Sequence, residues 1–122
     1  MLNRSLILGL LLTTSLLSAQ SAFTPSPPLG IPLVLSGTFA ELRGNHFHGG
    51  IDIKTQGRSG LKINAVADGY VSRVAVSPYG YGNALYLRHP EGYTTVYGHL
   101  NAFYPELEKW VEDQLRDRSK ND

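Results

Sequence analysis

Two histidines and one aspartate lie within seven residues of this chain, at His46, His48 and Asp52. Imidazole nitrogens and carboxylate oxygens are ordinary zinc ligands, and a catalytic zinc site uses about three protein ligands. The His48-x-x-x-Asp52 spacing therefore provides two candidate ligands of one metal ion. The spacing alone leaves open a second reading, a loop histidine that is hydrogen-bonded to a nearby carboxylate.

The segment between these two residues must bend if both are to hold one metal ion. Gly49 and Gly50, followed by Ile51, disfavour a helix interior. On a straight strand His48 and Asp52 would share a face but lie about 13 Å apart, at roughly 3.3 Å per residue. Bonds to zinc are about 2 Å long, so that separation is too large. We therefore expect a kink, which the glycine pair permits.

Composition narrows the chemistry that the chain can use. The 122 residues are enough for one domain with a modest core, and they include no cysteine. Thiolate zinc sites, disulfides and cysteine nucleophiles are thereby excluded, so any metal site must use histidine and carboxylate.

The N-terminal residues 1–22 are typical of a secretory signal peptide. Arg4 provides a positive charge, residues 6–17 form a short apolar run, and residues 18–22 are mostly small, as at a cleavage site. The alternative is an uncleaved membrane anchor, which the polar residues 13–15 disfavour. We expect an exported protein, in the periplasm, the envelope or outside the cell, with no stable membrane span after cleavage.

Removal of Arg4 with the signal peptide leaves 10 basic and 10 acidic side chains. A neutral chain without a basic cluster gives no support for nucleic-acid binding.

The remaining sequence predicts an all-β domain. Residues 23–32 hold four prolines and are expected to form an extended linker, and residues 33–104 are expected to form the N-terminal part of the β domain. Short runs rich in branched and aromatic residues predict strands, and turn residues divide them into antiparallel hairpins. The predicted strands are Ile31–Leu35, Leu61–Val66, Tyr70–Val76, Asn83–Arg88 and Tyr93–Leu100.

The turn before the last strand is the best specified. Pro90 suits the second position of a type I turn, and Gly92 can adopt the left-handed conformation that follows it, so the flanking strands should pair in register. His89, in this turn, is interpreted as structural.

Period two along the last strand predicts one amphipathic face that ends at His99, and an opposite face that is mostly core. The amphipathic face holds Tyr93, Thr95, Tyr97 and His99, and the core face holds Thr94, Val96, Gly98 and Leu100. An imidazole at the end of a polar face could transfer protons in a cleft. A surface histidine at a strand end is the alternative.

Four segments, in this order, resemble the lysostaphin-type zinc endopeptidases of bacterial cell walls, the M23-like peptidases. The resemblance covers roughly residues 37–100. The segments are His48-Gly49-Gly50-Ile51-Asp52, Ala65-Val66-Ala67-Asp68-Gly69-Tyr70-Val71, Gly80-Tyr81-Gly82-Asn83 and Tyr97-Gly98-His99-Leu100.

The resemblance implies an antiparallel barrel-sandwich fold and a role for three residues. His48 and Asp52 would bind zinc, and His99 would assist catalysis. In the family a third ligand and a second catalytic histidine come from a later His-x-His motif, and no histidine follows His99 in this sequence. His46, two residues from His48, is the candidate to replace the missing ligand.

Where the family has its His-x-His motif and further strands, residues 105–122 of this sequence predict an amphipathic helix of about 14 residues. Pro105 suits its first turn, apolar residues recur at helical spacing, and acidic residues come early and basic residues late. We expect Trp110 and its neighbours to pack on the sheet or on a partner. A helical insertion or tail at this point makes the β domain incomplete and predicts a truncated gene product or a fragment.

Two functional classes follow from these observations. The first is a zinc endopeptidase that acts on the peptide crosslinks of peptidoglycan and is impaired in this chain. The second is a non-catalytic peptidoglycan-binding or regulatory module, which the missing His-x-His motif favours. A third, a carrier domain of the lipoyl type, is disfavoured because the turn near Asp68 contains no lysine.

Overall fold

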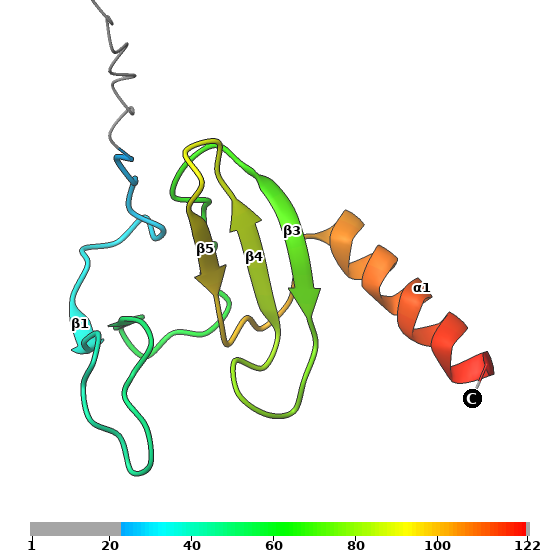
Figure 1. Cartoon of the computed structure of the whole chain (residues 1–122), viewed down its shortest axis with the longest axis horizontal. Coiled ribbons are helices and arrows are strands. Elements are labelled where there is room, and N and C mark those ends of the chain that lie inside the picture. The colour runs from blue at the N-terminus through cyan, green and yellow to red at the C-terminus, as the bar shows by residue number, and fades with distance from the viewer. Residues whose placement is uncertain (1–22, 122) are drawn as a thin grey trace, which may run out of the picture.

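The computed structural model describes residues 23–121, which form two separate antiparallel sheets and one C-terminal helix (Figure 1). The strands are β1 Leu35–Gly37, β2 Asp52–Ile53, β3 Tyr70–Ala75, β4 Ala84–Arg88 and β5 Thr94–Tyr97, and the helix is α1 Pro105–Asn121. β1 pairs with β2, and the second sheet has the order β3-β4-β5. The prediction of a mostly β fold with one C-terminal helix is confirmed, but the described strands do not close into a barrel. The predicted signal peptide lies outside the described residues.

The three-stranded sheet follows the sequence closely. β4 pairs with β5 in an unbroken register from Leu85 opposite Tyr97 to Arg88 opposite Thr94. The N–H of Gly92 donates to the carbonyl of His89 at 3.0 Å, and Gly92 has a φ of +90°. The predicted turn and the pairing in register are therefore confirmed.

The predicted faces of the last strand are reversed within β5, residues 94–97. Val96, expected in the core, is 44% exposed, whereas Thr95 and Tyr97 are partly buried. The backbone N–H of Val66 donates to the Tyr97 hydroxyl at 2.9 Å, so the segment of Val66 covers the face that carries Thr95 and Tyr97. β5 also ends at Tyr97, which stops the period-two alternation before His99.

Two predicted strands are wrong in their position. The run 61–66 makes only an isolated bridge at Ile63, to Leu29, because its partner contains Pro27 and Pro28, which have no N–H for a ladder. Hydrogen bonds from Ser26 N to Val66 O and from Asn64 N to Pro28 O hold the rest of this contact. The entry strand begins only at Leu35, beyond Pro32, and not at residue 31.

The core is small, and its buried apolar side chains come from the N-terminal segment, from β4 and from α1. The buried apolar side chains are Leu29, Ala84, Leu87 and Val111. His89 is also buried, and the ring of Phe23 packs against it with centroids 5.1 Å apart.

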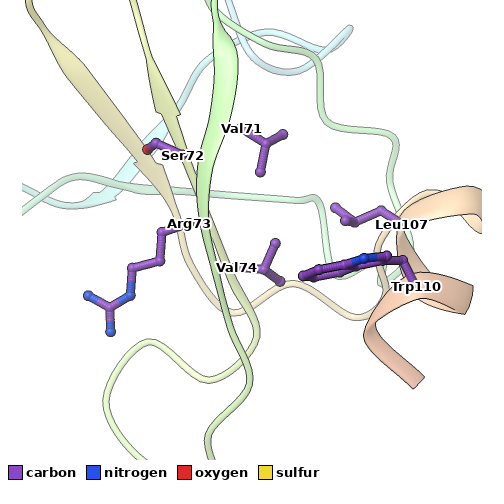
Figure 2. Close-up of a pocket in the computed structure, with 6 residues that line it drawn as sticks. All are labelled: Val71, Ser72, Arg73, Val74, Leu107 and Trp110. Carbon is purple, nitrogen blue, oxygen red and sulfur yellow. The ribbon is translucent and has the colours of Figure 1, made fainter. Parts of the chain in front are cut away.

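The helix begins at Pro105, as predicted. The Glu108 carboxylate accepts a 2.6 Å hydrogen bond from the N–H of Phe103, which fixes the chain before the helix to its first turn. Leu107 and Trp110 face Val71 and Val74 of β3 across a shallow groove of about 230 Å³ (Figure 2). No helix within residues 23–121 is long and apolar enough to cross a membrane.

Candidate metal centre

The structure brings His48 and Asp52 together. His48 Nε2 lies 3.3 Å from Asp52 Oδ1, and no helix forms between the two residues. The chain bends at Gly50 instead, so the predicted kink is confirmed.

Backbone hydrogen bonds in residues 38–48 place the histidine. The chain runs out from β1 and turns back, with the N–H of Arg43 donating to His46 O, the N–H of His48 to Glu41 O and the N–H of Ala40 to His48 O, each at 2.8 Å. His48 thereby returns to the end of β1.

The short β1–β2 pair places the aspartate at the same point. Asp52 lies opposite Gly37 in this pair, and the register shifts between Leu35 and Gly37. A hydrogen bond from Lys54 N to Val34 O, at 2.8 Å, extends the pairing by one step on the other side. The carboxylate of Asp52 is thus fixed to the strand that leads into the loop carrying His48.

The ring nitrogen Nδ1 of His48 has two contacts, which favour different tautomers. Nδ1 lies 3.3 Å from Arg43 Nη2, which can only donate a hydrogen bond, and 3.0 Å from the carbonyl oxygen of Thr38, which can only accept one. We assign the ring proton to Nδ1 because the contact with the carbonyl is the shorter of the two. In the neutral ring Nε2 then presents a lone pair to Asp52 Oδ1. Two lone pairs face each other comfortably only when a proton or a metal cation lies between them.

Arg43 holds the other oxygen of the same carboxylate. Arg43 Nη2 donates to Asp52 Oδ2 at 2.7 Å. This hydrogen bond is the largest influence on the pKa of Asp52 and lowers it below the ordinary value, outweighing desolvation, while the charges of His48, Arg43 and His99 lower it further. Asp52 is therefore ionised at neutral pH, as a metal ligand must be.

His99 lies on the same side of the molecule as this pair. It follows the end of β5, is exposed, and is close enough to Asp52 for its charge to act on the carboxylate. The N–H of His99 donates to Tyr81 O at 2.7 Å, and His99 has a φ of +55°, in the left-handed region that non-glycine residues seldom occupy.

Tyr81 lies between the end of β5 and the loop after His48. No role was predicted for it from the sequence. A methyl group added at Gly98 would lie 3.2 Å from the Tyr81 ring, and one added at Gly49 would lie 3.3 Å from the Tyr81 hydroxyl. The ring thus connects the end of β5 to the loop after His48. The only signal in the sequence was its place between Gly80 and Gly82, which the structure shows at a positive φ.

The other histidines take no part in the pair. His46 is exposed, and its Nδ1 lies 2.7 Å from Asn45 Oδ1. His89 is buried, with Nδ1 2.7 Å from Asp68 O and Nε2 2.9 Å from Thr95 Oγ1, which confirms its structural role. Within residues 23–121 no three histidine, aspartate or glutamate side chains are grouped closely enough to hold a metal ion.

The donor pair itself fits zinc. Two ligands of a tetrahedral zinc ion, with bonds of about 2.0 to 2.1 Å, lie about 3.3 Å from each other. The separation of His48 Nε2 and Asp52 Oδ1 is 3.3 Å. The second nitrogen of the imidazole bonds to a carbonyl and the second oxygen of the carboxylate to Arg43, as is usual around metal ligands.

Comparison with known protein families finds a match that covers these residues. The model of peptidase family M23 matches residues 46–114, which is more than half of the chain and includes His48, Asp52 and His99. The chain belongs to peptidase family M23. No curated protein and no solved structure matches it.

Proposed function

We propose that this chain carries part of the active site of an exported zinc endopeptidase that cleaves peptide crosslinks in peptidoglycan. The observation that supports this most directly is the pair His48 Nε2 and Asp52 Oδ1, 3.3 Å apart, with the far nitrogen of the ring bonded to Thr38 O. Family membership supports a peptidase.

A zinc ion at this pair would polarise the peptide carbonyl and lower the pKa of water to about 7. The protein's own contribution is to hold the ionised carboxylate of Asp52 and the Nε2 atom of His48 side by side, 3.3 Å apart. His99, exposed beside them, is placed to take up or release a proton through its imidazole. Its left-handed backbone supports this role, because strain of this kind gathers at functional sites.

A third protein ligand is needed for catalysis, and we propose that a His-x-His segment not contained in these 122 residues provides it. The β3 and β5 edges of the three-stranded sheet have no strand beside them among the described residues. Further strands pairing there would complete the barrel-sandwich domain that the family resemblance implies.

The alternative function is a non-catalytic module that binds peptidoglycan peptides. The absence of a third metal ligand near His48 and Asp52 within residues 23–121 favours it. The two functions differ in one measurable property: only the peptidase gains crosslink cleavage when a His-x-His segment is added.

The test measures zinc stoichiometry and crosslink cleavage for the 122-residue chain and for a chain extended by a His-x-His segment. The short chain should bind zinc weakly and cleave little or nothing, and the extension should raise both. In the extended chain Asp52→Ala should abolish both, whereas His99→Ala should lower turnover about 10² to 10⁴-fold and keep the metal. His46→Ala is the control and should change neither.

Two results would contradict this proposal. Unchanged zinc binding in the Asp52→Ala variant would remove Asp52 from the site. Tight zinc binding and cleavage by the short chain, lost on His46→Ala, would make His46 the third ligand. Export is tested separately by N-terminal sequencing of the envelope fraction, which should begin between residues 19 and 23; an intact Met1 form in the cytosol would contradict it.

A further inference from the structure

We propose that Arg43 is a positioning residue of the metal centre, which turns one oxygen of Asp52 toward His48. This inference rests on the proposed zinc site and adds to it a residue outside the His-x-x-x-Asp motif. Arg43 Nη2 donates to Asp52 Oδ2 at 2.7 Å, while Asp52 Oδ1 faces His48 Nε2 at 3.3 Å. Each oxygen of the carboxylate therefore has a distinct partner.

A separate restraint is needed because Asp52 has little else to hold it. Its side chain is 41% exposed, and β2 is only two residues long. A free aspartate carboxyl rotates broadly about χ2, which would turn Oδ1 away from His48. A charge-assisted hydrogen bond to Oδ2 fixes that rotation and leaves Oδ1 to a metal ion.

Gly37 provides the space for this contact. A methyl group on Gly37 would lie 2.5 Å from Arg43 Nη2 and would also collide with Asp52 Oδ2. Gly37 lies opposite Asp52 in the β1–β2 pair, beside the shift in register. A side chain at this position would push the guanidinium and the carboxylate apart.

A network of polar contacts connects Arg43 to the other ligand as well. Glu41 Oε2 accepts a 2.9 Å hydrogen bond from the N–H of Thr38, and Glu41 Oε1 lies 3.6 Å from Arg43 Nε. The carbonyl of the same Thr38 contacts His48 Nδ1. One short segment, residues 38–43, thus orients both His48 and Asp52.

The charge of Arg43 does not make the site repel a cation. Glu41 and Asp52 both lie near the guanidinium, so the three side chains together carry a net charge of minus one. Glu41 balances Arg43, and the charge of Asp52 remains to attract a metal ion.

The experiment is a titration of the 122-residue chain with zinc, in a His46→Ala background that removes the nearby exposed imidazole. The ¹⁵N shifts of the His48 ring report binding at Nε2. Arg43→Gln should weaken zinc binding about 10 to 100-fold, the usual effect of losing an outer partner of a metal ligand. The Arg43→Lys variant should also bind zinc weakly, because lysine keeps the positive charge but lacks the planar guanidinium.

Two further variants keep the result interpretable. Gly37→Ala, which leaves Arg43 in place, should weaken zinc binding as well. Arg58→Gln removes the same charge from an exposed arginine whose Nη2 donates to Gln56, and should change zinc affinity less than about twofold. Circular dichroism and the dispersion of the amide spectrum verify that each variant is folded.

The outcomes separate this inference from the proposed function. If the parent chain shows no zinc at His48 Nε2, the proposed metal centre falls, and the role of Arg43 falls with it. If the parent binds zinc but Arg43→Gln and Gly37→Ala bind it equally tightly or more tightly, only the positioning role is overturned. If Arg58→Gln weakens binding as much as Arg43→Gln, charge and not geometry explains the effect, and the inference is also overturned.

Discussion

The three-stranded sheet and the candidate metal centre are held together in different ways. In the sheet, β4 forms backbone ladders with both neighbours, and a turn of four residues sets the register of β5. At the metal centre the strands have three and two residues, and side chains make the decisive contacts. The sheet is specified by backbone pairing, and the centre by side-chain and carbonyl contacts within residues 38–52.

This difference separates stability from function. Backbone ladders and a buried histidine stabilise the sheet, so changes there should unfold the domain. The contacts of Asp52 are half exposed, so changes there should affect metal binding more than stability. The predictions below test this separation, beginning with the largest expected effect.

Replacing His89 should cause the largest loss of stability. His89→Ala removes a buried ring that contacts Phe23, takes away the side-chain partner of Asp68 O and leaves Thr95 Oγ1 with only the Tyr97 hydroxyl. We expect the free energy of unfolding to fall by about 2 to 4 kcal/mol, from the cavity and the lost hydrogen bonds. Urea unfolding measures this. The control His46→Ala should lie within about 0.5 kcal/mol of the parent, and an equal loss in both variants would contradict the separation.

The hydroxyl of Tyr97 should have the next largest effect. Tyr97→Phe keeps the ring but leaves the N–H of Val66 unpaired, so we expect a loss of about 1 to 2 kcal/mol. Tyr93→Phe is the matched control, because Tyr93 is exposed and its ring contact with Phe23 is kept. Thermal unfolding of the two variants should show a clear difference, and equal melting temperatures would show that the Val66 contact does not stabilise the fold.

The sequence predicted the sheet well where the signal was local. The turn at residues 89–92 follows from Pro90 and Gly92 alone, and β3 and β4 follow from their branched and aromatic residues. The strand predicted at 61–66 failed because its fate depends on a proline-containing segment more than 30 residues earlier. A propensity for β structure does not show which partner a segment will find.

At the metal centre the sequence predicted the pair but not its surroundings. His48 and Asp52 followed from zinc chemistry and the need for a kink. Arg43 and the Thr38 carbonyl could not be predicted, because an arginine and a backbone oxygen match no ligand pattern. The sequence also did not predict which face of β5 is covered, because the Tyr97 face is covered by the segment of Val66, which is distant in sequence.

His99 allows backbone strain and chemistry to be separated at one position. His99→Gly and His99→Ala both remove the imidazole, but only glycine accepts the observed φ of +55° without strain. We expect the glycine variant to be about 1 kcal/mol more stable than the alanine variant, and both to lose the same turnover in an active, extended chain. Urea unfolding and crosslink cleavage measure the two effects. Equal stabilities would mean that the left-handed backbone at His99 is not strained.

The smallest effect is expected at Val96, where the sequence predicted core and the structure shows an exposed side chain. Val96→Thr keeps the branched shape that suits a strand, so the free energy of unfolding should change by less than about 0.5 kcal/mol. For comparison, Leu87→Ala on the buried face should lower the free energy of unfolding by about 2 to 4 kcal/mol.

The Val96 measurement is best made at several protein concentrations. β5 is an edge strand among the described residues, and an exposed edge can pair with a second chain. A loss of about 1.5 kcal/mol or more at every concentration would show that Val96 is covered within the monomer and that the predicted core face was right. A loss that appears only at high concentration would instead indicate that Val96 is buried between two chains. Because Val96 is exposed in the structure, we expect neither loss: the valine and threonine variants should be equally stable at every concentration.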